Sequence, residues 1–271
     1  MIRIGKTVIK PKYFPDGTLN LNYDIPISYC TEDNPVNIFW NFENNEELII
    51  LTFLTYHLRD KGIEDIYLIM PYLPNARMDR TQNNDEVFTL KYFCKIINSL
   101  NFKMVNILDA HSNVGVALLD RVVDEPPFDY IMEVYSDIVE STGDKPLIFY
   151  PDEGAMKRYT KLMLPEYVFG IKKRDWNTGT ILGLEVEGNI ESIKGQDILI
   201  IDDICSKGGT FYYSAKKLKE LGAKDIYLYV THCENSIFDG ELLKGENSDL
   251  IKKIYTTNSL ITKKHKKIKV I

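Results

Sequence analysis

Cysteine pairs, long apolar runs and a surplus of basic charge are all missing from this chain of 271 residues. Its cysteines are Cys30, Cys94, Cys205 and Cys233, which form no C-x-x-C pair and have no histidine at zinc-ligand spacing. This arrangement argues against a disulfide framework and against a structural metal. We therefore expect a protein of the reducing cytoplasm.

Membrane and nucleic-acid partners are disfavoured for similar reasons. The longest apolar runs, 48–54 and 198–201, are far shorter than the roughly 20 residues of a membrane span, and the start at Met1 shows no signal-peptide core. The chain carries 33 basic and 39 acidic residues, a net charge of -6, so a broad surface for nucleic acid or anionic lipid is not expected. The basic tail 263–269 is interpreted as a solvated terminal strand. Any anionic ligand must then be held by a local group of residues.

Short β-rich apolar runs alternate with longer amphipathic stretches, which is the pattern of βαβ units and a largely parallel sheet. The first half predicts strands at 66–70 and 104–108 and helices at 46–61 and 88–100. The second half predicts strands at 147–150, 168–172, 198–201 and 226–230, and a helix at 210–221 that ends at Gly222, a C′ glycine. A polar, turn-rich stretch at 141–146 separates the halves. We expect two α/β domains, 1–143 and 144–271.

The sharpest local signal is a buried strand that delivers two carboxylates and then a glycine turn that opens a helix. It runs from Ile198 through Asp202-Asp203 to Ser206-Lys207-Gly208-Gly209-Thr210. Backbone N–H groups freed by the glycines, the helix N-terminus and the Thr210 hydroxyl would form an anion cradle. Adjacent carboxylates at a strand's carboxyl end can accept hydrogen bonds from vicinal ribose hydroxyls, and open α/β sheets bind ligands at that end. The segment predicts a site for a phosphorylated sugar.

This segment resembles the PRPP loop of the phosphoribosyltransferase superfamily. Within that superfamily, Pro71-Tyr72-Leu73-Pro74-Asn75-Ala76-Arg77-Met78-Asp79-Arg80 resembles the PY-x2-AR-x-DR segment of ribose-phosphate diphosphokinases, the PRPP synthetases, whose arginine lies on the ATP triphosphate. An arginine at a strand's carboxyl end suits charge-assisted contacts to phosphate oxygens. The resemblance therefore indicates a protein that makes PRPP rather than one that uses it.

Further segments resemble the same family in the family's order, from about residue 10 to residue 269. The family's adenine site, which a neighbouring subunit supplies, is similar to Phe14-Pro15-Asp16-Gly17-Thr18, and its D-L-H segment, whose histidine helps to bind Mg·ATP, is similar to Asp109-Ala110-His111. The family's metal segment is similar to Tyr150-Pro151-Asp152-Glu153-Gly154, and its K-R-R segment, which leads into a flexible catalytic loop, is similar to Lys172-Lys173-Arg174. Thr231-His232 and Thr257-Asn258-Ser259 resemble the family's T-H and T-N-T segments.

The resemblance implies two phosphoribosyltransferase-type α/β domains, and a homo-oligomer, dimer or hexamer, with ATP sites at subunit interfaces. It also implies transfer of pyrophosphate from Mg·ATP to the 1-hydroxyl of a 5-phosphorylated ribose. Lys172 and Arg174 would be catalytic, and His111 and Asp152 would hold Mg²⁺. The ATP-binding residues would be Phe14, Asp16, Thr18, Arg77, Met78, Asp79 and His111, and the ribose phosphate would be held by Asp202, Asp203, Ser206, Lys207, Gly208, Gly209 and Thr210.

The sugar-phosphate loop departs from the family's usual D-D-x2-D-T-x-G-T at two positions. Ser206 stands in place of the third Asp and Lys207 in place of its Thr neighbour. The local charge rises by about two units, which favours a more anionic acceptor. Ribose 5-phosphate is the first candidate acceptor, and ADP-ribose, used by a phage-type relative in NAD⁺ salvage, is the alternative.

Smaller departures affect the adenine and ATP segments, where Met78 replaces Gln and Thr18 replaces Glu. Two other classes of function stay open. One is a non-catalytic regulatory subunit that binds nucleotide without turnover, and the other is a transferase that consumes PRPP. Lys172, Arg174, His111 and Asp152 together argue against the first, and the segment around Arg77 argues against the second.

Overall fold

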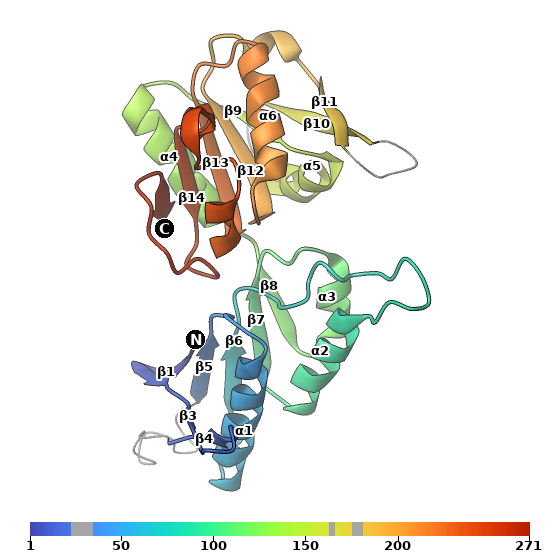
Figure 1. The fold of residues 1–271 in the computed structure, drawn as a ribbon, viewed down its shortest axis with the longest axis vertical. Helices are drawn as coiled ribbons and strands as arrows, with labels where there is room; N and C mark the ends of the chain where they lie inside the picture. The colour runs from blue at the N-terminus through green and yellow to red at the C-terminus, as the bar shows by residue number, and fades with distance from the viewer. Residues whose placement is uncertain (23–34, 163–165, 175–180) are drawn as a thin grey trace. The chain divides into compact units, whose positions relative to one another are not determined.

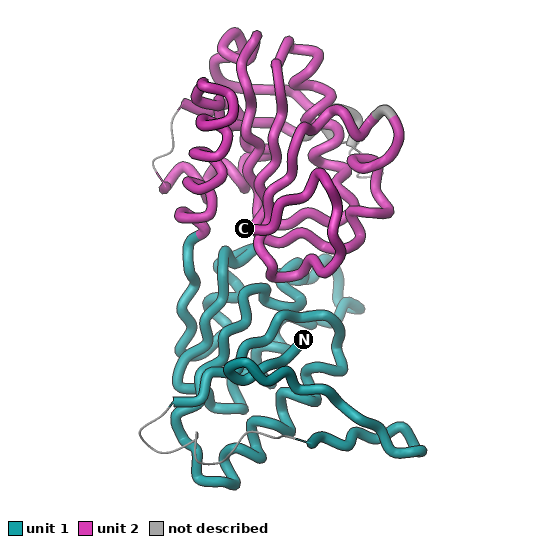
Figure 2. The backbone as a smooth tube through the Cα atoms, turned by 90° about the vertical axis from the view of Figure 1, so that its left-hand side faces the viewer, with its two compact units in different colours: residues 1–126 teal, residues 127–271 magenta. Residues whose placement is uncertain are grey.

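The computed structural model describes residues 1–22, 35–162, 166–174 and 181–271. These residues form two compact units, 1–126 and 127–271 (Figure 2). Each unit contains a mainly parallel sheet flanked by helices, as the alternation of strand and helix patterns predicts. In the described part of the chain, no helix is both long enough and apolar enough to cross a membrane.

Unit 1 is built on a six-stranded sheet in the order β2-β1-β5-β6-β7-β8. Strands β5 to β8 are parallel, whereas β1 pairs antiparallel with both β2 and β5. The strands are β1 (Ile2–Ile4), β2 (Thr7–Ile9), β5 (Val36–Trp40), β6 (Ile66–Ile69), β7 (Met104–Leu108) and β8 (Val122–Glu125), and a separate hairpin pairs β3 (Lys12–Tyr13) with β4 (Leu19–Asn20). The helices are α1 (Glu46–Asp60), α2 (Thr89–Ser99) and α3 (Asn113–Leu118) (Figure 1).

Unit 2 is built on a seven-stranded sheet in the order β11-β10-β9-β12-β13-β14-β15. All neighbours are parallel except β10 and β11. The strands are β9 (Leu147–Tyr150), β10 (Tyr167–Arg174), β11 (Ile181–Glu187), β12 (Ile198–Cys205), β13 (Ile226–Cys233), β14 (Lys253–Thr256) and β15 (Ile268–Val270). The helices are α4 (Phe128–Thr142), α5 (Glu153–Tyr159) and α6 (Gly209–Glu220), with 3-10 turns η2 (Thr160–Leu162), η3 (Ile190–Ile193), η4 (Asn235–Asp239) and η5 (Gly245–Leu250).

Both faces of the unit 2 sheet are buried, which explains why the first half of β12, residues 198–201, is apolar at every position. Ile198 and Ile200 of β12 belong to one core cluster, together with Phe211 of α6. Leu199 and Ile201, which point to the opposite face, belong to a second cluster with residues of α4 and α5. A parallel sheet covered on both faces requires such continuous hydrophobic runs.

The predicted elements agree with the structure in type and nearly in extent, and Gly222 has the positive φ, 89°, of a C′ glycine. The domain boundary differs, because the units divide between Pro126 and Pro127 rather than at 143/144. Helix α4 is the reason. Its buried residues Ile131, Val134, Tyr135 and Ile138 pack into the second core cluster of unit 2, so the helix belongs to that unit and not to the first.

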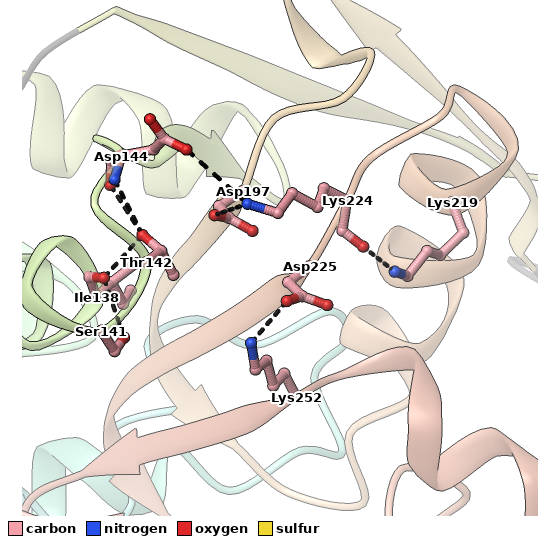
Figure 3. A network of polar contacts seen from close by, with 9 residues as sticks. All are labelled: Ile138, Ser141, Thr142, Asp144, Asp197, Lys219, Lys224, Asp225 and Lys252. Atoms are coloured by element: carbon pink, nitrogen blue, oxygen red, sulfur yellow. Dashed lines mark hydrogen bonds and ion pairs between the residues drawn. The ribbon is translucent and has the colours of Figure 1, made fainter.

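Charged side chains at the amino ends of the unit 2 strands are paired with one another (Figure 3). Asp197, which directly precedes β12, has a fully buried side chain, and its Oδ2 lies 3.2 Å from Lys224 Nζ. Lys224 Nζ also lies 3.9 Å from Asp144 Oδ2. Lys252 Nζ lies 2.7 Å from Asp225 Oδ2 in the same region. Hydrogen bonding to Asp197 raises the pKa of Lys224. These pairs join the turns that precede β9, β12, β13 and β14.

Candidate functional site

The glycine loop after β12 has the predicted strand-loop-helix form. Strand β12 extends through Asp202 and Asp203 to Cys205, and α6 begins at Gly209. Gly208 has a φ of +79°, and a Cβ there would lie 2.4 Å from Leu242 Cδ1. A Cβ on Gly209 would meet no atom within 4 Å. The first glycine is therefore needed for the turn, whereas the second leaves open space at the helix N-terminus, where backbone N–H groups favour an anion.

The segment that follows β13 supports this loop from behind. A Cβ on Gly240 would lie 1.7 Å from the carbonyl oxygen of Lys207, so only glycine permits this approach of the two backbones. The backbone N–H of Glu234 donates to the carbonyl of Cys205 at 2.8 Å. Ser206 Oγ lies 3.0 Å from Ser236 Oγ, which in turn lies 2.8 Å from Glu234 Oε2. The loop is held by contacts that the sequence pattern did not predict.

Three carboxyl groups and one guanidinium lie at the carboxyl end of the central strands. Asp203 is 4% exposed, and its Oδ2 accepts a hydrogen bond of 2.9 Å from Arg158 Nη1 of α5. Burial, followed by the negative charges of Asp203 and Asp152, raises the pKa of Asp202 well above its usual value. Asp202 Oδ1 accepts the backbone N–H of Asp203 at 3.0 Å. Carboxyl oxygens at this edge are suitable partners for ligand hydroxyls and cations.

Asp152, the predicted metal ligand of unit 2, has a structural role as well. It is the N-cap of α5, and its Oδ1 accepts the backbone N–H of Ala155 at 3.0 Å. After burial and Asp203, its negative charge is a further cause that raises the pKa of Asp202. The structure thus brings Asp152, after β9, and Asp202 and Asp203, in β12, to one edge of the sheet.

The donors at this edge are oxygens, which Mg²⁺ prefers, and Mg²⁺ usually takes one or two carboxylates together with water and substrate phosphates. Across the described ranges, no set of three or more His, Cys, Asp or Glu side chains is arranged to hold a metal ion. The predicted ligands His111 and Asp152 belong to different units, 1 and 2. The carboxylates of unit 2 fit an ion that is shared with a phosphorylated substrate.

Lys172 and Arg174, the predicted catalytic residues, belong to the last part of β10, and their side chains lie outside what the structure describes. Strand β10 runs parallel to β9, with Phe169 opposite Tyr150. The backbone at 172–174 is therefore at the same edge of the sheet as Asp152. Residues 175–180, where the predicted flexible loop begins, are outside the described residues.

In unit 1, the structure brings together the segments after β6 and β7. The backbone N–H of Leu108 donates to the carbonyl of Pro71 at 2.9 Å, which joins the two segments at their start. Asp79 accepts hydrogen bonds from Arg80 Nε and Nη2 at 2.9 and 3.3 Å. These bonds lower the pKa of Asp79, and the nearby Ser112 and His111 lower it further. Asp79 and His111, predicted from separate motifs, are therefore neighbours.

Two backbone features mark the same part of unit 1. Asp109, which is 5% exposed and directly follows β7, has a φ of +48°. Asn75, in the loop that contains Arg77 and Met78, has a φ of +63°. Left-handed backbone is uncommon for non-glycine residues, although Asn101 and Arg121, outside these segments, adopt it as well. Arg77 is exposed and Met78 half-buried, so both are reachable by a ligand.

The predicted adenine segment forms the tip of the β3–β4 hairpin, where Asp16 Oδ1 accepts the N–H and hydroxyl of Thr18 at 3.0 and 2.7 Å. The Thr18 backbone N–H, then its hydroxyl, lowers the pKa of Asp16. Phe14 is 51% exposed. Within unit 1, the hairpin lies at the end opposite to the carboxyl ends of β6 and β7 (Figure 1). The ATP residues predicted for this unit are thus separated into two groups.

Arg158, Glu234, Ser236 and Gly240 take part in the site or its support and were not predicted from the sequence. Arg158 is 45 residues from Asp203 and Ser236 is 30 residues from Ser206, so no local spacing reveals these contacts. In the sequence, Gly240 is marked as a candidate for a close backbone contact only by its place shortly after the end of β13.

Three curated relatives of this chain share one name. "Ribose-phosphate pyrophosphokinase" from Corynebacterium ammoniagenes is 28% identical over 260 residues, which is 94% of this chain and 78% of that protein. The protein of the same name from Thermococcus kodakarensis is 30% identical over 194 residues, which is 70% of this chain and 66% of that protein. The one from Bacillus subtilis is 27% identical over 98% of this chain and 81% of that protein. No protein-family model matches the chain.

A solved structure shows the same fold. The phosphoribosylpyrophosphate synthetase from Mycobacterium smegmatis superposes with a TM-score of 0.76 and 18% sequence identity, covering 98% of this chain and 86% of that one. At this identity the likeness is evidence for the fold alone. Both α/β units therefore have the phosphoribosyltransferase-type architecture that the sequence predicts.

Proposed function

The chain belongs to the ribose-phosphate pyrophosphokinase family, and on this premise we propose that it transfers the pyrophosphate of Mg·ATP to the 1-hydroxyl of a 5-phosphorylated ribose. With ribose 5-phosphate the products are PRPP and AMP. The observation that carries the proposal is the carboxyl edge of the unit 2 sheet, where Asp202 and Asp203 lead into the loop of Gly208 and Gly209. It provides for a sugar diol and a phosphate side by side.

The acceptor is bound by unit 2 in this proposal. The carboxyl groups of Asp202 and Asp203 accept hydrogen bonds from the ribose hydroxyls, and Arg158 holds the Asp203 side chain in place. The 5-phosphate lies over the N-terminus of α6, in the open space beside Gly209, where Thr210 and the loop N–H groups donate to it. Lys207, which is exposed, adds a positive charge at the mouth of the loop.

The donor is bound by residues of unit 1. Arg77 and His111 contact the triphosphate, with Asp79 holding the segment after β6 beside His111. Phe14, Asp16 and Thr18 hold the adenine at the hairpin tip. Because hairpin and loop lie at different ends of unit 1, we infer that the adenine of one ATP is held by the hairpin of a second copy, which makes the protein a homo-oligomer.

The reaction is an in-line attack of the ribose 1-hydroxyl on the β-phosphorus of ATP, with AMP as the leaving group. Positioning and charge neutralisation supply most of the rate in such transfers. Mg²⁺, when bound through His111, Asp152 and the phosphates, would neutralise charge on the phosphate oxygens. Lys172 and Arg174 stabilise the negative charge that develops on the transferring group.

ADP-ribose is the second candidate acceptor, and the loop itself is the reason. Ser206 and Lys207 stand where the family has an aspartate and a threonine, so the loop is more positive by about two charges. A 5-diphosphate carries an additional phosphate group for which Lys207 is available. The chemistry at the anomeric hydroxyl is the same with either acceptor.

The test is AMP release from Mg·ATP by the purified protein, with ribose 5-phosphate and ADP-ribose compared as acceptors and products identified by mass. Lys172→Ala should lower kcat by about 10² to 10³-fold and leave ATP affinity nearly unchanged, because its charge acts on the transferring group. Lys173→Ala is the matched control and should retain activity. Unchanged turnover in Lys172→Ala contradicts the catalytic assignment. No AMP with either acceptor favours a regulatory subunit, and PRPP consumption with a base favours a transferase.

A further inference from the structure

A pocket lies at the amino edge of the unit 2 sheet, at the end of the strands opposite to the phosphate loop that follows β12. Strands β9, β10 and β12 run parallel, so the residues that precede them meet at this edge. The pocket is lined by Lys145 before β9, Glu166 before β10 and Gln196 before β12, and by residues of α4 and the η3 segment. Its volume is about 400 Å³, within the range of roughly 300–1,000 Å³ that is usual for small-molecule sites.

The buried part of the pocket lining is apolar except for one hydroxyl group. Tyr135 of α4, Pro146 and Leu147 are buried. The Tyr135 hydroxyl is buried as well, and within the described ranges it has no hydrogen-bond partner, which is costly for a polar group. Burial raises the pKa of Tyr135, so the hydroxyl keeps its proton and can donate. A ligand acceptor that displaces the side chain slightly would satisfy this donor.

The exposed part of the pocket lining carries charges of both signs. Lys145 and Lys194 bring two ammonium groups, and Glu166 and Glu191 bring two carboxylates, so the charges of the lining sum to zero. A polyanion such as a nucleotide would meet two carboxylates as well as two lysines and gain little. A molecule that carries one charge of each sign can pair with both kinds of side chain at once. The apolar part and the charged part together therefore favour an amphipathic zwitterion.

We propose that this pocket is a second ligand site of unit 2 and that it binds a small amphipathic zwitterion, of the class of amino acids with an apolar side chain. The apolar side chain packs against Pro146 and Leu147. The ligand carboxylate lies near the two lysines and accepts a hydrogen bond from the Tyr135 hydroxyl, and the ligand ammonium group lies near the two glutamates. The site is separate from the residues assigned to ATP and the acceptor, so it does not depend on the proposed function.

The experiment is isothermal titration calorimetry of the full chain with L-phenylalanine and L-leucine, and with 3-phenylpropionate and phenethylamine, which each keep only one of the two charges. At least one of the amino acids should bind, and L-phenylalanine should bind about 3-fold or more tightly than either single-charge compound. Tyr135→Phe should weaken amino-acid binding about 5-fold, and Lys194→Ala about 3-fold.

Two controls accompany these variants. Lys216→Ala, on α6 at the other face of the sheet, is the matched control for Lys194→Ala and should bind as the wild type does. Urea unfolding of the ligand-free protein is the second control. Tyr135→Phe should not lower the free energy of unfolding, because the hydroxyl has no partner within the described ranges whose bond would be lost.

Absence of binding by both amino acids overturns the proposal, and equal affinity for the three phenyl compounds overturns the zwitterion as its ligand. Equal weakening in Lys194→Ala and Lys216→Ala would mean that the ligand responds to net charge rather than to this pocket. A less stable Tyr135→Phe would mean that the hydroxyl serves the fold and not a ligand. Displacement of the bound amino acid by ribose 5-phosphate would place it at the phosphate loop and also overturn the proposal. Failure of the proposed function is seen separately, in the absence of AMP release.

Discussion

Replacing Gly208 by alanine should destabilise unit 2, and the structure allows the size of the loss to be worked out. Gly208 has a φ of +79°, where an L-residue costs roughly 1–2 kcal/mol. The new Cβ would also lie 2.4 Å from Leu242 Cδ1 and 2.9 Å from its Cγ. Overpacking of a tight core costs about 1–3 kcal/mol. The two effects together predict a loss of about 2–5 kcal/mol in the free energy of unfolding.

Gly209→Ala is the matched control, because Gly209 has no positive φ and its Cβ would meet no atom within 4 Å. Its free energy of unfolding should stay within about 1 kcal/mol of the wild type. Leu242→Ala, tested alone and with Gly208→Ala, separates the two costs. Since alanine at 242 removes the clashing branch, the two changes should be less than additive by about 1–3 kcal/mol.

Urea unfolding followed by circular dichroism measures these differences, with the transition of unit 2 fitted separately if the two units unfold in sequence. If Gly208→Ala and Gly209→Ala unfold at the same urea concentration, the reasoning from φ and from the Leu242 contact is refuted. The activity assay adds a second distinction. Gly209→Ala should fold normally and yet raise the KM for the acceptor, because its Cβ enters the space assigned to the 5-phosphate.

Two further predictions concern ion pairs of unit 2. Arg158→Met should raise the KM for the acceptor about 10-fold with little change in the KM for ATP, because Asp203 loses a charged hydrogen bond of 2.9 Å. Arg158→Lys should restore part of the loss. Equal effects on the KM values of both substrates would contradict a role at the sugar. Asp137 of α4 accepts hydrogen bonds from Tyr255 and two lysines of β14 and β15, and these lower its pKa, the Tyr255 bond most. A carboxyl group whose pKa is lower in the folded state stabilises the fold at pH values above its pKa in the unfolded chain, about 3.9. This stabilisation is lost as the pH falls through the pKa of the folded state. Asp137→Asn should therefore cost about 1–2 kcal/mol at pH 7, and the difference from wild type should shrink on acidification below about pH 4; a difference that stays constant with pH would contradict this assignment.

The parts of the structure that the sequence predicts well are those with a local cause. The run 198–201 is apolar at every position because both faces of β12 are buried, and Gly208 and Gly222 mark the two ends of α6 through their positive φ. Such features depend on neighbours in sequence. The strand, the loop and the helix therefore follow from the local sequence.

The parts that the sequence did not reveal depend on distant residues. Arg158 reaches Asp203 across 45 positions, and an arginine on a short amphipathic helix is normally a surface residue. The polar stretch 141–146 resembles a linker, but the units divide before α4, because α4 belongs to the same core cluster as Ile148 and Tyr150 of unit 2. The side chains of Lys172 and Arg174 are outside the described part, so their catalytic role stays a prediction.

Both ends of the unit 2 sheet contain ion pairs, but carboxyl groups crowd together at the carboxyl end. At the amino ends, Asp197 and Asp225 each face a lysine, so charge is neutralised where strands begin (Figure 3). At the carboxyl ends, the pKa of Asp202 is raised by burial and by the carboxylates of Asp203 and Asp152. Crowding of like charges destabilises the folded protein unless another function retains it. A bound ligand whose hydroxyl groups satisfy these carboxyl groups would lessen that repulsion, so we expect substrate binding to raise the free energy of unfolding of unit 2.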